Sequence, residues 1–243
     1  MTKPAGFQCK QFFVAHEQCA MKVGTDSLIL GSIAEPVHAR RILDIGTGSG
    51  LLALMMAQKS DANCTVDAVE LDERAALQAE TNFAQSPWAE RLCVKREDIA
   101  RFEPDARYDL IISNPPYFAG HDDRTRAYET MDEQRKLARL EHGLRIEDFF
   151  RHCARLLAGE GSVYCVYPHQ RHNDVATAAN DAGLFVDQRW DVHNKADSLP
   201  KVSVYRLSAM ASVTQIHSLT IRNEDNSYSD EFKTLCQAFY LNF

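Results

Sequence analysis

Short apolar runs alternate with longer amphipathic segments along most of the chain. The runs are rich in branched side chains and too short for helices, which predicts buried strands. Between them, apolar residues recur at helical spacing, so the alternation predicts an α/β sheet covered by helices. The expected strands are 41–45, 65–69, 92–94, 109–113 and 162–167, and the expected helices are 51–57, 72–84, 146–157 (stopped at 159–161 by GEG) and 171–182.

The N-terminal residues extend this pattern. Bulky side chains alternate loosely over 7–14, which predicts a strand, followed by a turn or second strand through 19–22. Thr25 is predicted to be the N-cap of a helix that runs from Asp26 to about Ala34.

The C-terminal third is predicted to close the sheet. Residues 184–192 and 202–209 have a β-rich composition and are expected to form an antiparallel pair. A strand extension near 220–222 and a helix over 232–239 follow. We expect a single domain over 1–243, with its core at 37–211, an N-terminal extension and first helix at 1–36, and a C-terminal extension at 212–243.

Composition sets limits on the partners. The chain has 243 residues, of which 45% are hydrophobic, and this is enough for one substantial core. Its formal net charge of -7 argues against binding nucleic acid through bulk electrostatics, because phosphate contacts need Lys and Arg. Any nucleic-acid site is therefore expected on a local basic face.

The seven cysteines are scattered and include no C-x-x-C pair, which indicates neither a disulfide framework nor a zinc site and fits a reducing cytoplasm. His16 and Cys19 lie three residues apart, but without further ligands packing is favoured over metal binding. The longest apolar run, 51–57, is too short to span a bilayer, and the N-terminus carries no apolar signal core. We expect a soluble, unexported, cytoplasmic protein with no metal and no membrane partner.

A glycine-rich segment, DIGTGSG at 44–50, connects the first core strand to a helix. The glycines allow a tight turn and a close approach of the backbone to a ligand, and the helix N-terminus favours an anionic group such as a carboxylate. Dinucleotide and nucleoside sites share such loops, so this segment alone does not separate them.

Acidic residues follow the next two strands. Glu70 lies twenty residues beyond Gly50, where a carboxylate can accept both ribose hydroxyls of an adenosine-type cofactor. Asp98 lies at another strand end, where it can accept from an adenine amino group. The alternatives are a helix-capping acid for Glu70 and a solvated loop carboxylate for Asp98. Their occurrence together, after successive strands, favours a nucleoside cleft.

Asn114-Pro115-Pro116-Tyr117 follows the strand 109–113, and its prolines exclude both helix and further strand pairing. The lone pair of an exocyclic amine is delocalised into its ring, so alkylation requires acceptors that localise it. The Asn114 side-chain oxygen and the Pro115 carbonyl can each accept one N–H, while Tyr117 offers a face for the ring. A simple proline turn is the alternative, and the neighbouring cleft residues favour an amine-activating site.

Residues 118–145 form a polar connection rich in both charges. It is either a substrate loop or a solvated surface. We expect an RNA-binding face drawn from Lys3, Lys10, Arg124, Arg126 and Arg139.

Residues 44–50 and 114–117 resemble the class I S-adenosylmethionine-dependent methyltransferases that act on amino groups. Similarity at 10–16, 21–26, 67–71, 86–91, 226–229 and 237–241 extends nearly end to end. There the chain resembles the bacterial tRNA1(Val) adenine-N6-methyltransferases, which modify an adenine beside the anticodon.

The resemblance implies a Rossmann-like α/β fold with a seven-stranded, mostly parallel sheet, helices on both faces and a short N-terminal β extension. It also implies S-adenosylmethionine as the cofactor. The residues implied are Asp44, Gly46, Gly48 and Gly50 at the methionine part, Glu70 at the ribose, Asp98 at the adenine, Asn114 beside both cofactor and base, and Pro115, Pro116 and Tyr117 at the target base. Lys22 and Thr25 either touch the cofactor carboxylate or have a structural role.

The expected function is methyl transfer to N6 of an adenine in tRNA, by a protein favoured to be a monomer. Methylation of a protein glutamine is the enzymatic alternative, but those enzymes carry a helical domain before the glycine loop, where only about forty residues stand here. An adenine in another RNA or DNA remains open. A silent binding module would be expected to lose the Asn114 motif, and a nicotinamide dehydrogenase does not explain it.

Overall fold

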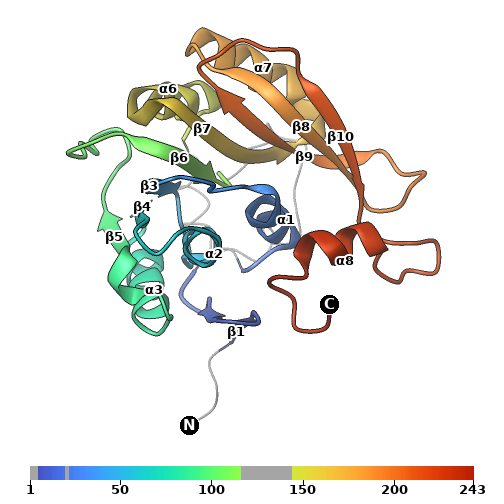
Figure 1. The fold of residues 1–243 in the computed structure, drawn as a ribbon, viewed down its shortest axis with the longest axis horizontal. Coiled ribbons are helices and arrows are strands. Elements are labelled where there is room, and N and C mark those ends of the chain that lie inside the picture. The colour runs from blue at the N-terminus through green and yellow to red at the C-terminus, as the bar shows by residue number, and fades with distance from the viewer. Residues whose placement is uncertain (1–4, 20–21, 116–143) are drawn as a thin grey trace, which may run out of the picture.

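A computed structural model describes residues 5–19, 22–115 and 144–243, and its centre is an eight-stranded sheet in the order β10-β8-β9-β7-β6-β3-β4-β5 (Figure 1). Of its pairings, β9 is antiparallel to β7 and β8, and the others are parallel. The strands are β3 (Arg41–Ile45), β4 (Thr65–Glu70), β5 (Leu92–Arg96), β6 (Tyr108–Ser113), β7 (Leu157–Pro168), β8 (Phe185–His193), β9 (Pro200–Ser208) and β10 (Gln215–Thr220).

The described part of the sheet contains one strand more than the seven predicted. The additional strand is β10, which pairs in parallel with β8 from Gln215 opposite Gln188 to Thr220 opposite His193. The sequence pattern placed only a short extension near 220–222. Pairing with β10 satisfies the backbone groups that β8 would otherwise leave at the sheet edge, a long-range gain that local pattern does not reveal.

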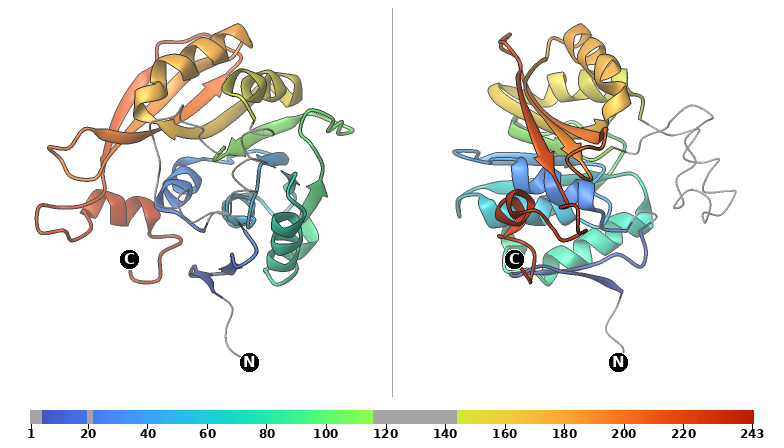
Figure 2. Two further views of the ribbon diagram at one scale, coloured as in Figure 1. Left: turned by 180° about the vertical axis from the view of Figure 1, so that it is seen from behind. Right: turned by 90° about the vertical axis from the view of Figure 1, so that its right-hand side faces the viewer.

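Helices cover both faces of the sheet, as predicted (Figures 1 and 2). On β3, Ile42 packs into one core and its neighbour Leu43 into the other, because successive side chains point to opposite faces. The Ile42 core includes residues of α1 (Thr25–Ile33), α2 (Leu51–Lys59), α3 (Glu73–Ala84) and α8 (Asp230–Cys236). The Leu43 core includes residues of α6 (Ile146–Leu156) and α7 (His172–Asp181).

Two predicted boundaries were wrong. Thr25 is the first residue of α1 and not its cap, because Gly24 holds the extended N-cap position. The segment 159–161 does not stop α6, since β7 begins directly after the helix, at Leu157. A side chain at Gly161 would lie 3.0 Å from the Asp109 carbonyl oxygen, so glycine serves the close approach of β7 to β6.

The N-terminal extension is a hairpin and not the single strand expected over 7–14. Strands β1 (Gly6–Gln8) and β2 (Phe13–Ala15) pair in antiparallel fashion. The turn between them is closed by the Cys9 N–H, which donates to the Phe12 carbonyl at 2.9 Å. Cys19 and Lys22 are not in a strand, and the two residues between them lie outside the described ranges.

The hairpin is held by the C-terminal segment. Lys10 Nζ donates to the carbonyl oxygens of Gln237 and Phe243, the latter at 2.8 Å. Beside it, the rings of Tyr240 and Phe243 stack with centroids 4.5 Å apart, and the Phe7 ring meets Tyr240 edge-on. These contacts join segments from opposite ends of the chain.

Asn82 of α3 joins the hairpin to the glycine loop. Its side chain is 2% exposed, and its Oδ1 accepts from the Ala15 N–H at 3.1 Å. Its Nδ2 donates to the Ala15 and Ser49 carbonyls, both at 2.8 Å. One buried amide therefore fixes three backbone groups.

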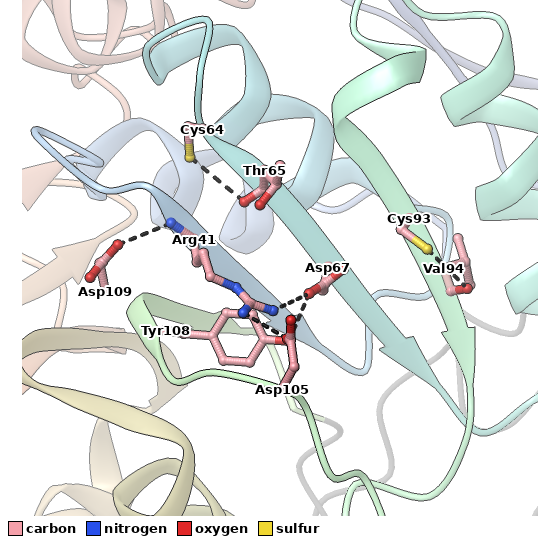
Figure 3. A network of polar contacts seen from close by, with 9 residues as sticks. All are labelled: Arg41, Cys64, Thr65, Asp67, Cys93, Val94, Asp105, Tyr108 and Asp109. Atoms are coloured by element: carbon pink, nitrogen blue, oxygen red, sulfur yellow. Dashed lines mark hydrogen bonds and ion pairs between the residues drawn. The ribbon is translucent and has the colours of Figure 1, made fainter.

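A polar network lies near the amino ends of the central strands (Figure 3). The Arg41 guanidinium pairs with Asp105 at 2.7 Å and with Asp67 at 3.4 Å. The Tyr108 hydroxyl donates to the same Asp67 carboxylate at 2.8 Å. The network ties β3, β4 and β6 together at the end remote from the loops that follow these strands. No helix in the described ranges is long and apolar enough to cross a membrane.

We predict that Asn82→Ala lowers the free energy of unfolding by at least about 2 kcal/mol, because it leaves buried backbone groups of Ala15 and Ser49 without partners. Urea denaturation measures this loss. Asn173→Ala, at an exposed position of α7, is the matched control and should cost less than about 0.5 kcal/mol. Equal stability losses in the two variants would contradict the role of Asn82.

Candidate functional site

The carboxyl ends of β3, β4, β5 and β6 lie at one edge of the sheet, because these strands are parallel neighbours. The segments that follow them carry the glycine loop, Glu70, Asp98 and Asn114. The structure thus brings together, along one edge, four features that the sequence separates by up to seventy residues. In open α/β sheets, ligands bind at this edge.

Asp44, near the end of β3, is fully buried and pins the glycine loop to α2. Its Oδ2 accepts from the Thr47 hydroxyl at 2.6 Å and from the Ala53 N–H at 3.1 Å. Burial raises the pKa of the Asp44 carboxyl to about 7, against the opposing effect of these two bonds. Its Oδ1 is also buried and has no hydrogen-bond partner within the described ranges.

The three glycines of the loop have left-handed φ angles of 68°, 54° and 85° at Gly46, Gly48 and Gly50. They differ in what a side chain would meet. At Gly50 a Cβ would lie 2.5 Å from the Phe83 ring of α3, so this glycine serves packing. At Gly46 and Gly48 a Cβ would meet no described atom within 4 Å, so the backbone there is open to a ligand.

Glu70, the last residue of β4, connects the glycine loop to the start of α3. Its Oε2 accepts from the Gly48 N–H at 2.8 Å and its Oε1 from the Asp72 N–H at 2.9 Å. Burial raises the pKa of Glu70, and these backbone bonds oppose the shift. The helix cap is Asp72, which accepts from the Ala75 N–H. Each Glu70 oxygen keeps a further acceptor site for a hydroxyl.

A hollow of about 530 Å³ lies next to Glu70 and is lined by Leu71, Arg96, Glu97, Asp98 and Arg101. Asp98 Oδ1 accepts from the Ala100 N–H at 2.9 Å. The Leu71 side chain is 53% exposed and contributes apolar surface to the hollow. The sequence interpretation passed over Leu71, although an apolar residue directly after a strand-end acid is a usable signal. The lining combines the apolar Leu71 with two carboxylates and two guanidinium groups.

Asn114 directly follows β6. The buried Ser113 hydroxyl donates to the Ile45 carbonyl at 2.7 Å and so ties this strand end to β3. Asn114 Nδ2 donates to the Ser27 hydroxyl oxygen of α1 at 2.8 Å. The sequence interpretation missed Ser27, because no local pattern places α1 beside β6. Pro115 is buried, and Pro116 and Tyr117 lie outside the described residues, so their roles stay predictions.

Lys22 lies on the segment that leads into α1, Thr25 is the first residue of that helix, and both are exposed. The structure describes no contact that tests their predicted place at the cofactor carboxylate. Nearby, the Val23 N–H donates to His16 Nδ1 at 3.3 Å, and burial followed by the charge of Lys22 lowers the pKa of His16. Within the described ranges, no three His, Cys, Asp or Glu side chains converge as metal ligands.

The predicted RNA contacts are placed only in part. Lys10 is described, and its ammonium group is bound to the C-terminal carbonyls. Lys3, Arg124, Arg126 and Arg139 lie outside the described residues, so their contacts with RNA stay predictions.

Residues 19–181 match the family model "Methyltransferase small domain". Among solved structures, a predicted O-methyltransferase from Agrobacterium tumefaciens is similar in fold, with a TM-score of 0.66, 17% identity, and coverage of 88% of this chain and 96% of that one. A putative RNA methyltransferase from Pyrococcus horikoshii has a TM-score of 0.51 and 19% identity, and the similarity covers 75% of this chain and 79% of that one. The chain is a Rossmann-like methyltransferase, as its strand order and glycine loop indicate.

Two curated relatives narrow the assignment. A protein of Salmonella arizonae is 44% identical over 97% of this chain and 95% of its own length. One of Yersinia pestis is 43% identical over 98% of this chain and 94% of its own length. Both are named tRNA1(Val) (adenine(37)-N6)-methyltransferase. The chain belongs to this family, which confirms the resemblance carried by residues 44–50 and 114–117.

The raised pKa of Asp44 predicts a specific pH dependence of stability. Its ordinary pKa of 3.8 applies to the unfolded chain, and about 7 applies to the folded one. Between these values the folded state holds a proton that the unfolded state has lost, so this group makes stability fall as pH rises. Asp44→Asn removes that contribution.

Relative to wild type, Asp44→Asn should therefore gain stability between about pH 5 and about pH 8, by up to about 3 kcal/mol. Urea denaturation across this range measures the difference. Asp61→Asn, at an exposed carboxyl, is the control. If the free energy of unfolding changes with pH equally in Asp44→Asn and in wild type, Asp44 does not titrate in this range.

Proposed function

We propose that this enzyme transfers a methyl group from S-adenosylmethionine to N6 of adenine 37 of tRNA1(Val). The observation that carries the proposal is the position of Asn114, one strand away from Asp44 at the sheet edge that holds the glycine loop. An amide at that position is suited to an amine acceptor. The names of the relatives that are 43–44% identical support adenine 37 as the acceptor.

The described residues fit the cofactor. A partnerless buried oxygen of Asp44 matches the ammonium group of the methionine part, and the N-terminus of α2 favours its carboxylate. The open backbone at Gly46 and Gly48 leaves room beside it, Glu70 matches the ribose, and the hollow beside Leu71 and Asp98 matches the adenine. Bound S-adenosylmethionine supplies a methyl group on a cationic sulfur, an electrophile for a neutral amine.

The protein's task is then to prepare the amine. We propose that the Asn114 Oδ1 and the Pro115 carbonyl accept its two N–H groups, which draws the nitrogen lone pair out of conjugation and aims it at the methyl group. Methylation leaves the nitrogen cationic, and its extra proton passes to solvent, because an amide and a peptide carbonyl are too weakly basic to keep it. Tyr117 is proposed to stack on the target base.

RNA binding is proposed to use a small basic face. The net charge of -7 is unfavourable for polyanions, so Lys3, Arg124, Arg126 and Arg139 are proposed to supply local phosphate contacts. A contact by Lys10 requires RNA to compete with the two carbonyls that hold its ammonium group. An adenine beside the anticodon lies in an unpaired loop, where extruding the base costs least.

We propose that the reaction takes place in the cytoplasm and that the enzyme is a monomer. All seven cysteines are described and carry free thiols, five of them buried, which fits a reducing compartment.

Labelled S-adenosylmethionine and unmodified tRNA1(Val) test the proposed function. The label is expected in adenine 37, and a transcript with guanosine in place of that adenine should remain unlabelled. Transfer of the label to a glutamine side chain of an added protein acceptor, or equal labelling of both transcripts, would overturn the proposal.

We predict that Asn114→Ala lowers the methyl-transfer rate by on the order of 10²–10³, by analogy with the loss of a preorganised oxyanion-hole donor. Affinity for S-adenosylmethionine should stay within a few-fold, because the amide acts on the amine. Single-turnover assays and calorimetry measure the two effects. Asn180→Ala, at an exposed position, is the control. Wild-type turnover in Asn114→Ala would remove Asn114 from the mechanism.

Glu70→Ala should have the opposite profile. Its main effect is to weaken cofactor binding by roughly 1–3 kcal/mol, because two ribose hydroxyls lose a buried acceptor. Calorimetry with S-adenosylmethionine checks this value, with the exposed Glu80→Ala of α3 as a matched control. A folded Glu70→Ala variant that binds the cofactor as tightly as wild type would leave Glu70 with only its backbone contacts.

A further inference from the structure

The hydrogen bond between Asn114 and Ser27 joins segments 87 residues apart in the sequence. Asn114 Nδ2 donates, and the Ser27 hydroxyl oxygen accepts at 2.8 Å. Both side chains are half-buried. We infer that Ser27 is a positioning residue for methyl transfer, which holds the Asn114 amide through its Nδ2 and so fixes where its Oδ1 lies. This inference rests on the proposed function of Asn114.

The orientation of the amide matters because its two ends have opposite chemistry. Oδ1 accepts hydrogen bonds, and Nδ2 donates them, although the two ends are similar in shape. If the amide turned over, Nδ2 would face the N–H groups of the acceptor amine, and two donors would meet. With Nδ2 directed at α1, the planar amide turns Oδ1 away from that helix. A hydroxyl can both donate and accept, so Ser27 does not choose between the two ends of the amide; its bond to Nδ2 holds the side chain at one torsion, with Oδ1 turned from α1.

The surroundings of Asn114 make Ser27 a suitable anchor. The backbone before Asn114 is fixed separately, since the buried Ser113 hydroxyl donates to the Ile45 carbonyl at 2.7 Å. That bond fixes the strand end and does not involve the Asn114 side chain. Ser27 lies in the first turn of α1, and the residues that follow it, from Leu28 to Ile33, are buried in the core. A rigid helix thus presents the hydroxyl to a rigid strand end, as preorganisation of a reactive group requires.

The experiment compares the single-turnover rate at saturating S-adenosylmethionine in wild type, Ser27→Ala, Ser27→Thr and Ser32→Ala. Ser27→Ala should lower the rate roughly tenfold, as loss of one hydrogen bond acting in the transition state. Its affinity for S-adenosylmethionine should stay within about twofold. Ser27→Thr keeps the hydroxyl and should restore most of the rate. Ser32→Ala is the matched control, because Ser32 lies in the same helix and its hydroxyl donates to Cys236 Sγ of α8 at 3.6 Å.

The same substitution in an Asn114→Ala background separates positioning from a general effect on α1. Without the amide there is nothing to position, so Ser27→Ala should change the residual rate by less than about twofold. An equal rate loss in both backgrounds, an unchanged rate in the wild-type background, or an equal loss in Ser32→Ala would overturn the inference.

The acceptor in this comparison is whichever one the wild-type enzyme methylates. Labelling of a site other than adenine 37 would refute the proposed function, and the Ser27 comparison would then be made on that acceptor. The dependence on Asn114 would still decide whether Ser27 positions the amide. The two ideas therefore fail through different results.

Discussion

The hydrogen bonds of the buried Asp44 carboxyl group determine the position of the glycine loop. Burial raises the pKa of this carboxyl to about 7, and the hydrogen bonds that Oδ2 accepts from the Thr47 hydroxyl and the Ala53 N–H oppose that rise. Those two bonds determine where the glycine loop leaves β3 and where α2 begins. Glu70 then holds the loop from the next strand through the Gly48 N–H. Burying this acid is costly, and its Oδ2 shapes the loop while its Oδ1 has no hydrogen-bond partner within the described ranges.

A second set of contacts supports this centre from segments distant in sequence. Asn82 joins the N-terminal hairpin to the carbonyl of Ser49 in the glycine loop, and Lys10 joins the hairpin to the C-terminal residues. Ser113 and Ser27 hold Asn114 from β3 and α1. The strands supply the positions of the site residues, while these polar contacts set their orientations. Stability near the amino ends of the strands is provided separately by the network around Arg41.

The fold by itself does not determine the chemistry. A predicted O-methyltransferase that is 17% identical has the same architecture, so the sheet and its helices are compatible with different acceptors. The feature suited to an amine is the amide at the end of β6, with the buried Pro115 directly behind it. The glycine loop and Asn114 thus follow neighbouring strands of the sheet.

The sequence by itself determined the strands and helices of the core and the order of acids and glycines at the strand ends, because hydrophobic period and glycine placement are local properties. It also indicated the family, because the motifs at 44–50 and 114–117 can be recognised without a structure. It did not determine the pairing of β10 with β8, the hairpin at 6–15, or the packing role of Gly50 against Phe83. It also did not predict the hydrogen bond of Asn114 with Ser27 or that of Lys10 with the C-terminal residue. Each of these contacts joins residues far apart in the chain, and only the packing of the whole sheet and its helices places them within a few ångströms of one another.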